Sequence, residues 1–184
     1  MPCVIVLAAG HGRRFAQSGG ATHKLDALLD GVSVLQRVLD SVAASGLPFH
    51  LVRPGATAAS DGMGDSIARG VAATAEAPGW LILPGDLPLI RPETLLQVAQ
   101  ALASSTVVLP FCNGSRGHPV GFAAPCRDSL LALSGDQGAA ALVRASREAG
   151  QVRVLELDDP GIVTDIDTLD DLARAEALLR AARQ

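Results

Sequence analysis

Short apolar runs alternate with longer amphipathic stretches along almost the whole chain of 184 residues. Each run is too short for a helix, and the first is rich in β-branched residues, which is typical of a strand buried on both faces. The strand at 120–123 is the candidate for an antiparallel orientation. The pattern predicts strands over residues 4–9, 49–53, 80–83, 106–109, 120–123 and 152–155.

The stretches between these runs carry apolar residues at helical spacing. Ser33 is a suitable N-cap for a first helix, which Gly46 and Pro48 end. Pro92 suits the first turn of another helix, because its missing N–H would have no intrahelical partner there. Thr168 and Asp171 form a start that resembles a capping box. The later helices are predicted over residues 66–75, 93–104, 139–149 and 169–182.

This alternation of strands and helices requires crossover connections and therefore a mostly parallel sheet. The predicted class is α/β: a single doubly wound, Rossmann-like domain over residues 1–184, with helices on both faces of the sheet. Ligands of such sheets bind beyond the carboxyl ends of the strands. The loops expected to form the site are 10–24, 54–64, 84–91, 110–119 and 156–167.

Composition excludes several classes of protein. Hydrophobic residues make up 48% and charged residues 18%, so the chain is not of the disordered class. Lys and Arg total 15 against 19 Asp and Glu, a net charge of −4, so we expect no nucleic-acid partner. No apolar run approaches the roughly 18 residues of a membrane helix, so we expect no membrane partner either.

The three cysteines indicate neither a disulfide framework nor a zinc site. Cys3, Cys112 and Cys126 are odd in number, far apart and without C-x-x-C spacing. We therefore expect a protein of the reducing cytoplasm.

The loop that follows the first strand concentrates glycines and positive charge. Gly10 and Gly12 allow a sharp turn, and Arg13, Arg14 and Lys24 suit a phosphate chain; the alternative is a flexible loop with solvated charges. The dinucleotide fingerprint fails because Phe15 stands where the third glycine is needed. The Walker A motif fails because Leu25, not Ser or Thr, follows Lys24.

A second glycine-rich segment, G-M-G-D-S at 62–66, opens the next predicted helix. A helix N-terminus with two glycines can approach a ligand closely, or the segment can be an ordinary helix cap. The role of Asp65 stays open between a helix cap, a ribose hydroxyl and a metal-bound water.

Three further segments carry candidate chemistry. Asp86 lies between two prolines at a strand end, where it can bind Mg²⁺ or form an Asx-type turn. Arg116 can bind a phosphate through its guanidinium, and His118 can contact it or serve as a structural hydrogen-bonding residue. Asp165 and Asp167 fall on one side of an extended stretch.

These motifs, taken in order, resemble those of the MobA-like nucleotidyltransferases, and most closely the molybdenum-cofactor cytidylyltransferases. The resemblance runs from Leu7 to Asp171, with Phe15 and Ala16 departing from the family's Met-Gly. The segments that carry it are L-A-A-G-H-G-R-R-F followed by Lys24, G-M-G-D-S, G-D-L-P, R-G-H-P-V-G-F, G-D-Q-G-A and D-I-D-T. Asp136, in the fifth of these, is expected to N-cap the helix that follows.

The resemblance implies a role for each matched residue. Arg14, Lys24 and Asp86 would be catalytic, and Mg²⁺ would be held by Asp86 and Asp167, with Asp165 as the alternative to Asp167. The acceptor would be bound by Arg116, His118 and Pro119. The nucleotide would be bound by Leu7, Ala8, Ala9, Gly10, Gly12, Arg14, Lys24, Gly62, Gly64, Ser66 and Asp86.

The implied reaction transfers CMP from CTP to the phosphate of molybdopterin and releases pyrophosphate; a molybdenum hydroxylase would receive the product. The choice of CTP follows from L-A-A-G, which is typical of cytidylyl members of the family. Two alternatives stay open: a different small acceptor, such as a sugar or polyol phosphate, and a non-catalytic carrier or insertion chaperone for the cofactor. A nicotinamide-dependent oxidoreductase is disfavoured by the broken glycine fingerprint.

Overall fold

The computed structural model describes residues 1–10, 12–54 and 62–181. Within these residues, a seven-stranded sheet has the order β4-β1-β5-β8-β6, and both β7 and β9 pair with β6. Its strands are β1 (Cys3–Leu7), β4 (Phe49–Val52), β5 (Gly79–Pro84), β6 (Val107–Cys112), β7 (Ser115–Arg116), β8 (Val120–Ala123) and β9 (Val152–Glu156).

The sheet is mostly parallel, as predicted. Strand β1 pairs in parallel with β4 and β5, and β6 pairs in parallel with β9. The candidate antiparallel strand, β8, does run against β5 and β6. A tight turn at Asn113 and Gly114, both with positive φ, reverses the chain after β6, so that the short β7 and then β8 return in the opposite direction.

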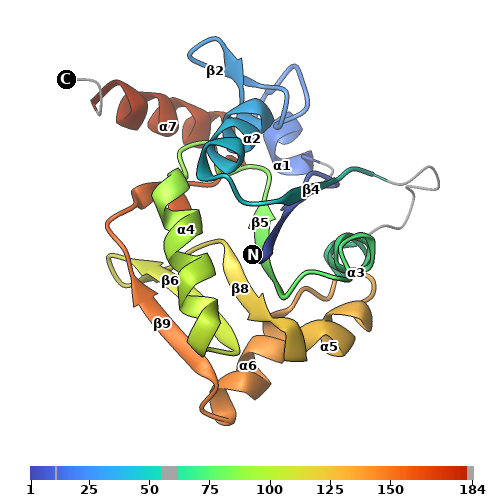
Figure 1. The fold of residues 1–184 in the computed structure, drawn as a ribbon. Coiled ribbons are helices and arrows are strands. Elements are labelled where there is room, and N and C mark those ends of the chain that lie inside the picture. Colours follow the sequence, from blue (N-terminus) through green and yellow to red (C-terminus); the bar gives the residue numbers. More distant parts are fainter. Residues whose placement is uncertain (11, 55–61, 182–184) are drawn as a thin grey trace.

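Helices cover both faces of the sheet (Figure 1). The helices are α1 (Arg13–Gln17), α2 (Val34–Ser45), α3 (Met63–Ala73), α4 (Pro92–Ala101), α5 (Arg127–Leu131), α6 (Ala140–Glu148) and α7 (Leu169–Ala181). Ser33 caps α2 by accepting from the N–H of Gln36, and Gly46 ends it in a left-handed conformation. Pro92 is the first residue of α4, which a 3₁₀ turn (Leu102–Ser104) extends.

Side-chain alternation along the strands divides the interior into two cores. In β1, Val4 and Val6 join a core with α2, α4 and α7, while Cys3 and Ile5 join the other core with α3, α5 and α6. Trp80 is fully buried in the second core, where its indole N–H donates to the Thr74 hydroxyl at 3.0 Å. The predicted doubly wound architecture is therefore confirmed.

The sequence pattern did not reveal several short elements. These are α1, α5, the strands β2 (Leu28–Leu29), β3 (Val32–Ser33) and β7, and the 3₁₀ turns η2 (Ala124–Cys126) and η3 (Pro160–Val163). Each is shorter than the window over which a period can be recognised.

Three boundaries need comment. Helix α3 begins at Met63, three residues before the prediction, because Gly62 is its N-cap. Residues 55–61 of the predicted loop and residue 182 of the predicted last helix lie outside the described residues.

No helix in the described part of the chain combines the length and apolar character needed to cross a membrane.

Candidate functional site

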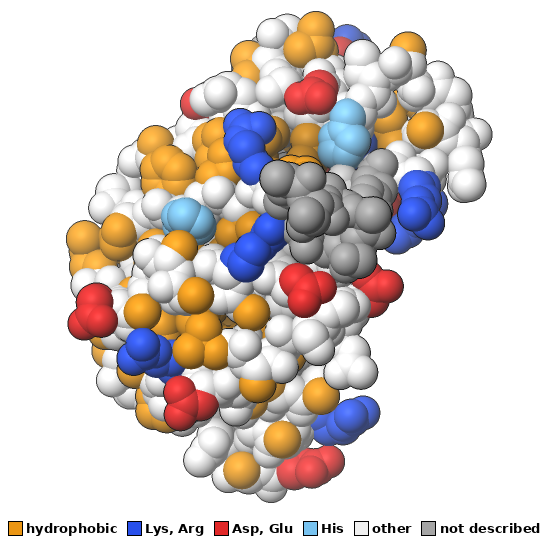
Figure 2. Space-filling model, turned by 90° about the vertical axis from the view of Figure 1, so that its right-hand side faces the viewer, with side chains coloured by type: hydrophobic (Ala, Val, Ile, Leu, Met, Phe, Trp, Pro, Cys, Tyr) orange, Lys and Arg blue, Asp and Glu red, His pale blue; other side chains and the backbone are white. Residues whose placement is uncertain are grey.

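A cavity of about 750 Å³ opens at the carboxyl ends of the central strands. It is lined by segments that follow β1 and β5, by the start of α3, by β7 and by the stretch before α7. Figure 2 shows one face of the molecule, where basic and histidine side chains lie among hydrophobic ones near the centre. The predicted site loops therefore meet in one cavity.

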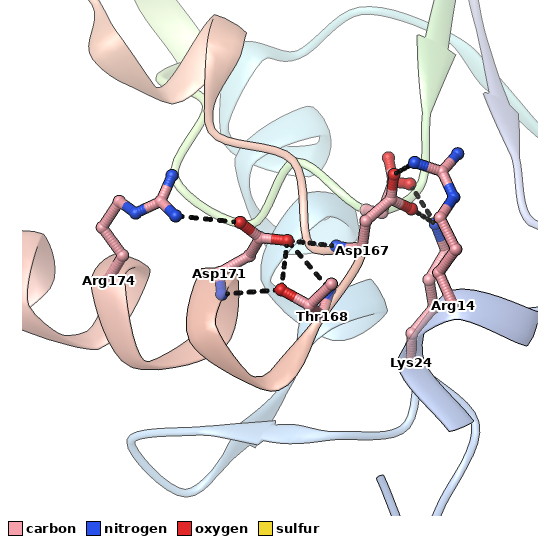
Figure 3. A network of polar contacts seen from close by, with 7 residues as sticks. Arg14, Lys24, Asp167, Thr168, Asp171 and Arg174 are labelled. Atoms are coloured by element: carbon pink, nitrogen blue, oxygen red, sulfur yellow. Dashed lines mark hydrogen bonds and ion pairs between the residues drawn. The ribbon is translucent and has the colours of Figure 1, made fainter. Parts of the chain in front are cut away.

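An ion-pair cluster lies at one end of this cavity. The ammonium of Lys24 is 2.6 Å from Oδ2 of Asp86 and 2.8 Å from Oδ1 of Asp167. The guanidinium of Arg14 is 2.6 Å from the other carboxylate oxygen of Asp167 (Figure 3). Lys24 and Asp86 are 62 residues apart in the sequence, so only the fold brings them together.

The cluster is partly withdrawn from water. The Lys24, Asp86 and Asp167 side chains are 12%, 16% and 20% exposed, whereas Arg14 is 75% exposed. Burial alone would lower the pKa of Lys24, but the carboxylates of Asp86 and Asp167 outweigh it and raise that pKa above its usual value. The Lys24 ammonium is therefore held in its charged form.

The backbone fixes both carboxylates. Asp86 follows β5, where the N–H of Gly85 donates to the carbonyl of Leu7, and its own carbonyl accepts from the N–H of Ile166. Ile166 is fully buried, so its neighbours Asp165 and Asp167 both face the cavity, as the alternation predicted.

Asp167 is held in turn by the start of α7. The carboxylate of Asp171 accepts from the N–H groups of Asp167 and Thr168 and from the Thr168 hydroxyl (Figure 3). The Thr168 hydroxyl accepts from the N–H of Asp171, so the predicted capping box is present. Partial burial alone would raise the pKa of Asp171, but these hydrogen bonds outweigh it and lower that pKa.

Burial also raises the pKa of Asp165, and the nearby charges of Asp86, Asp167 and Asp171 raise it further. Carboxylates in this part of the cavity therefore repel one another and favour a cation between them. One oxygen of Asp86, Oδ1, is buried and has no hydrogen-bond partner among the described residues.

The loop after β1 folds back on itself. Gly12 has a φ of +60° and precedes α1, a conformation that suits glycine. Phe15 is 1% exposed and packs into the core, where it leaves no room for a side chain at Gly20. The imidazole of His23 lies 2.8 Å from the carbonyl of Gly10 and closes the loop.

The segment proposed for the acceptor lies across the cavity, on β7 and the turn into β8. Ser115, Arg116 and His118 line the cavity, and the N–H of His118 donates to the carbonyl of Ile162 at 3.0 Å. The Nδ1 atom of His118 is buried without a partner among the described residues. Burial, aided by the Arg116 charge, lowers the pKa of His118 although Asp86 opposes this shift, so its ring is neutral near pH 7.

The predicted site residues divide into two groups. Four do not line the cavity: Ala8, Gly64 and Pro119 are buried, and Gly12 is half-buried outside the lining. The N–H of Ala8 is bonded to the carbonyl of Val52, and Pro119 follows His118 through a cis peptide bond. The residues that line it are Leu7, Ala9, Gly10, Arg14, Lys24, Gly62, Ser66, Asp86, Arg116, His118 and Asp167.

Two assignments in the glycine-rich segments are now decided by the structure. Asp65 is a cap: one of its carboxylate oxygens accepts from the N–H of Gly62 and also from that of Gly135. The expectation for Asp136 is wrong, because the N-cap of α6 is Ala139 and the Asp136 side chain lines the cavity instead.

Sequence reasoning also missed several residues. Asp159 is 2% exposed and accepts from the N–H of Arg91, the hydroxyl of Thr94 and the N–H of Gly161. No motif marks it, because its partners come from a distant segment. The missed cavity-lining residues are Leu25, Met63, Pro84, Gly85, Leu87, Ser115, Ile162 and Val163.

Comparison with known proteins gives a family for this arrangement. Residues 4–152 match the MobA-like NTP transferase domain. The purine catabolism protein PucB of Bacillus subtilis (strain 168) is 30% identical over 190 residues, which cover 91% of this chain and 92% of PucB.

Solved structures share the fold. A nucleotidyl transferase from Methanothermobacter (Mth528) superposes with a TM-score of 0.81 at 24% identity, over 98% of this chain and 99% of its own. The molybdopterin-guanine dinucleotide biosynthesis protein A of Archaeoglobus fulgidus gives a TM-score of 0.65 at 18% identity, over 97% and 99%. The chain therefore belongs to the MobA-like NTP transferase family and is a nucleotidyltransferase.

Proposed function

We propose that this protein transfers a nucleoside monophosphate, CMP from CTP, to the terminal phosphate of molybdopterin and releases pyrophosphate. The observation that carries the proposal is the position of Lys24, between Asp86 and Asp167, in a cavity that also takes in Arg14 and Arg116. Basic side chains beside two carboxylates suit a reaction between two polyanions, because the basic groups neutralise phosphate charge and the carboxylates can hold a divalent cation.

Mg²⁺ is the proposed cofactor, and the residues present fit it. Asp86 and Asp167 offer carboxylate oxygens, and the buried Oδ1 of Asp86 has no protein partner among the described residues. No group of three or more His, Cys, Asp and Glu side chains suited to a metal occurs in the described ranges. Mg²⁺ needs only one or two protein carboxylates, since phosphates and water complete its shell.

The chain's own residues would then neutralise charge and align the reactants. An ammonium has three donors and Lys24 uses two on the carboxylates, which leaves one N–H for a phosphate oxygen. Arg14 is mostly exposed at the cavity and would bind the departing pyrophosphate. A bound magnesium ion would supply further neutralisation of phosphate charge.

The acceptor would bind on the β7–β8 side. Arg116 would pair with its phosphate, and the neutral ring of His118 would hydrogen-bond beside it through Nδ1. The phosphate attacks the α-phosphorus of the nucleotide, the bond to the β-phosphate breaks, and pyrophosphate leaves with that electron pair. A phosphate monoester is already anionic near neutral pH, so the step needs no strong base.

The acceptor and the setting rest on similarity. The resemblance to cytidylyltransferases and the molybdopterin-linked name of the Archaeoglobus fulgidus protein both support molybdopterin. The name of PucB places that relative in purine catabolism, which suits delivery of the product to a molybdenum hydroxylase in the cytoplasm.

The test is a product assay. The protein is incubated with molybdopterin, Mg²⁺ and each of the four NTPs in turn, and pyrophosphate and the mass of the pterin product are measured. We expect a pterin cytosine dinucleotide with CTP. Asp86→Ala should lose at least about 1.5 kcal/mol of transition-state stabilisation, a tenfold or larger fall in kcat/KM.

The matched control is Asp40→Ala, which removes an exposed carboxylate from α2 outside the cavity and should leave turnover unchanged. A wild-type protein that binds the cofactor but releases no pyrophosphate would identify a carrier instead. Full activity of Asp86→Ala would contradict the metal assignment.

A further inference from the structure

Two glycine-rich segments are locked together beside the cavity. The N–H of Gly64 donates to the carbonyl of Gly135 at 2.8 Å. The carboxylate of Asp65 accepts from Gly62 N–H at 3.0 Å and from Gly135 N–H at 2.9 Å. The start of α3 and the turn before α6 therefore form one wall.

The contact between these segments is close enough to require glycine. A Cβ on Gly62 would overlap the backbone of Gly135, and one on Gly64 would meet backbone atoms of Ser134 and Gln137. A Cβ on Gly138 would lie 2.9 Å from the sulfur of Met63. Such packing fixes the backbone from which the side chains of this wall extend.

Met63 and Asp136 are the two large side chains that this wall presents. Met63 is 54% exposed although it is apolar, and it lines the cavity. Asp136 lines the cavity too, and its carboxylate has no hydrogen bond or ion pair with any residue that the structure describes. An apolar surface thus lies beside an unpaired hydrogen-bond acceptor.

The charge of Asp136 limits what it can contact. A carboxylate without a cationic partner repels phosphates, so in a site for a nucleoside triphosphate it is suited to the uncharged part of the ligand. An ionised carboxylate only accepts hydrogen bonds, so its partner must carry an N–H or O–H.

The position of the wall points to the nucleotide rather than the acceptor. Helix α3 packs on β4 and β1, whereas the Arg116 and His118 segment lies on β7 and β8, beyond β5. The cationic side chains of Lys24 and Arg14 are paired with Asp167, which directly precedes α7. Helix α7 packs in the core on the face of the sheet opposite to α3.

We propose that Asp136 is a specificity-determining residue, which accepts a hydrogen bond from a donor on the nucleoside part of the nucleotide while Met63 covers its apolar face. This inference rests on the proposed function and adds to it a residue that distinguishes nucleotides. The donor is either an amino group of the base or a ribose hydroxyl, and the experiment separates these sources.

The experiment measures equilibrium binding in Mg²⁺ without an acceptor. CTP and GTP are each compared with the analogue that lacks the amino group, UTP or ITP, and with their 2′-deoxy and 3′-deoxy forms. Asp136→Ala should weaken binding of the preferred nucleotide at least about tenfold. It should not weaken binding of the one analogue that already lacks the donor.

Asp136→Asn keeps an acceptor oxygen in place and should lie between the wild type and Asp136→Ala. Asp128→Ala removes an exposed carboxylate from α5 outside the cavity and serves as the control. Unchanged affinities in Asp136→Ala, or an equal loss for every nucleotide, would overturn the inference alone. A wild-type protein that binds no nucleotide would overturn the proposed function with it.

Discussion

Lys24 is the only lysine in a chain that otherwise carries 14 arginines. It lies where two carboxylates from different parts of the chain converge on one nitrogen, at 2.6 and 2.8 Å. A compact ammonium can bind both at once, whereas a planar guanidinium presents its donors in a rigid fork. The single lysine of the chain therefore joins both carboxylates through one nitrogen.

With this geometry, Lys24 and a divalent cation would share the carboxylates of Asp86 and Asp167. In Lys24→Met the two carboxylates lose their shared partner, and we expect the free energy of unfolding without metal to fall by about 1–3 kcal/mol. Added Mg²⁺ or Mn²⁺ should then raise the melting temperature of the variant more than that of the wild type. Thermal unfolding with and without metal measures both effects.

Arg180→Met is the control for this prediction, because it breaks an exposed ion pair with Glu176 on α7 and should change little. A variant of Lys24 whose melting temperature responds to metal no more than that of the wild type would contradict the sharing of these carboxylates between Lys24 and the ion.

At the scale of elements, several glycines allow loops to approach one another closely. The sequence suggested that Gly62 and Gly64 leave room for a bound molecule. In the structure they leave room for the backbone of residues 134–137. Likewise Gly117 packs on Ile162, and Gly161 packs on the backbone of Leu89 and Ile90.

Gly62→Ala tests this arrangement. Its methyl group would overlap the backbone of Gly135, and we expect unfolding to become easier by about 1–3 kcal/mol. Gly10→Ala is matched to it, because no atom lies within 4 Å of the position that its Cβ would take. Urea unfolding should show a lower midpoint for the first variant and little change for the second. Equal midpoints would contradict the close packing of Gly62 against Gly135.

At the scale of the whole molecule, one buried carboxylate joins distant parts of the chain. Asp159 reaches across 68 residues to the N–H of Arg91 at 3.0 Å and across 65 residues to the hydroxyl of Thr94 at 2.6 Å. It also accepts from Gly161, so it ties the turn η3 to the start of α4. The stretch after η3 carries Asp165 and Asp167 into the cavity.

Asp159→Ala should therefore destabilise the entire domain. It leaves two N–H groups and a buried hydroxyl without their acceptor, and we expect a loss of about 2–4 kcal/mol in the free energy of unfolding. Asp158→Ala, next to it but exposed, should have little effect because only its backbone carbonyl is used, by Arg91. Similar losses in the two variants would contradict this role of Asp159.

Much of the fold could be read from periodicity, because strands such as 4–9 and 120–123 are apolar on both faces and helices such as α2 carry explicit caps. The candidate site could be read in part, because Asp86 and Lys24 follow strand ends, where ligands of parallel sheets bind. Asp136 was misjudged because a carboxylate before a helix is typical of an N-cap, and the cap fell on Ala139 instead.

Local pattern alone determined the longer strands and helices and most of the polar side chains at their ends, because these depend on neighbours along the chain. Only the tertiary structure decided that Lys24 joins Asp86 and Asp167, that two glycine segments share a wall, and that Asp159 is buried. Those contacts depend on the order of strands in the sheet, and that order is set by packing between residues far apart in sequence.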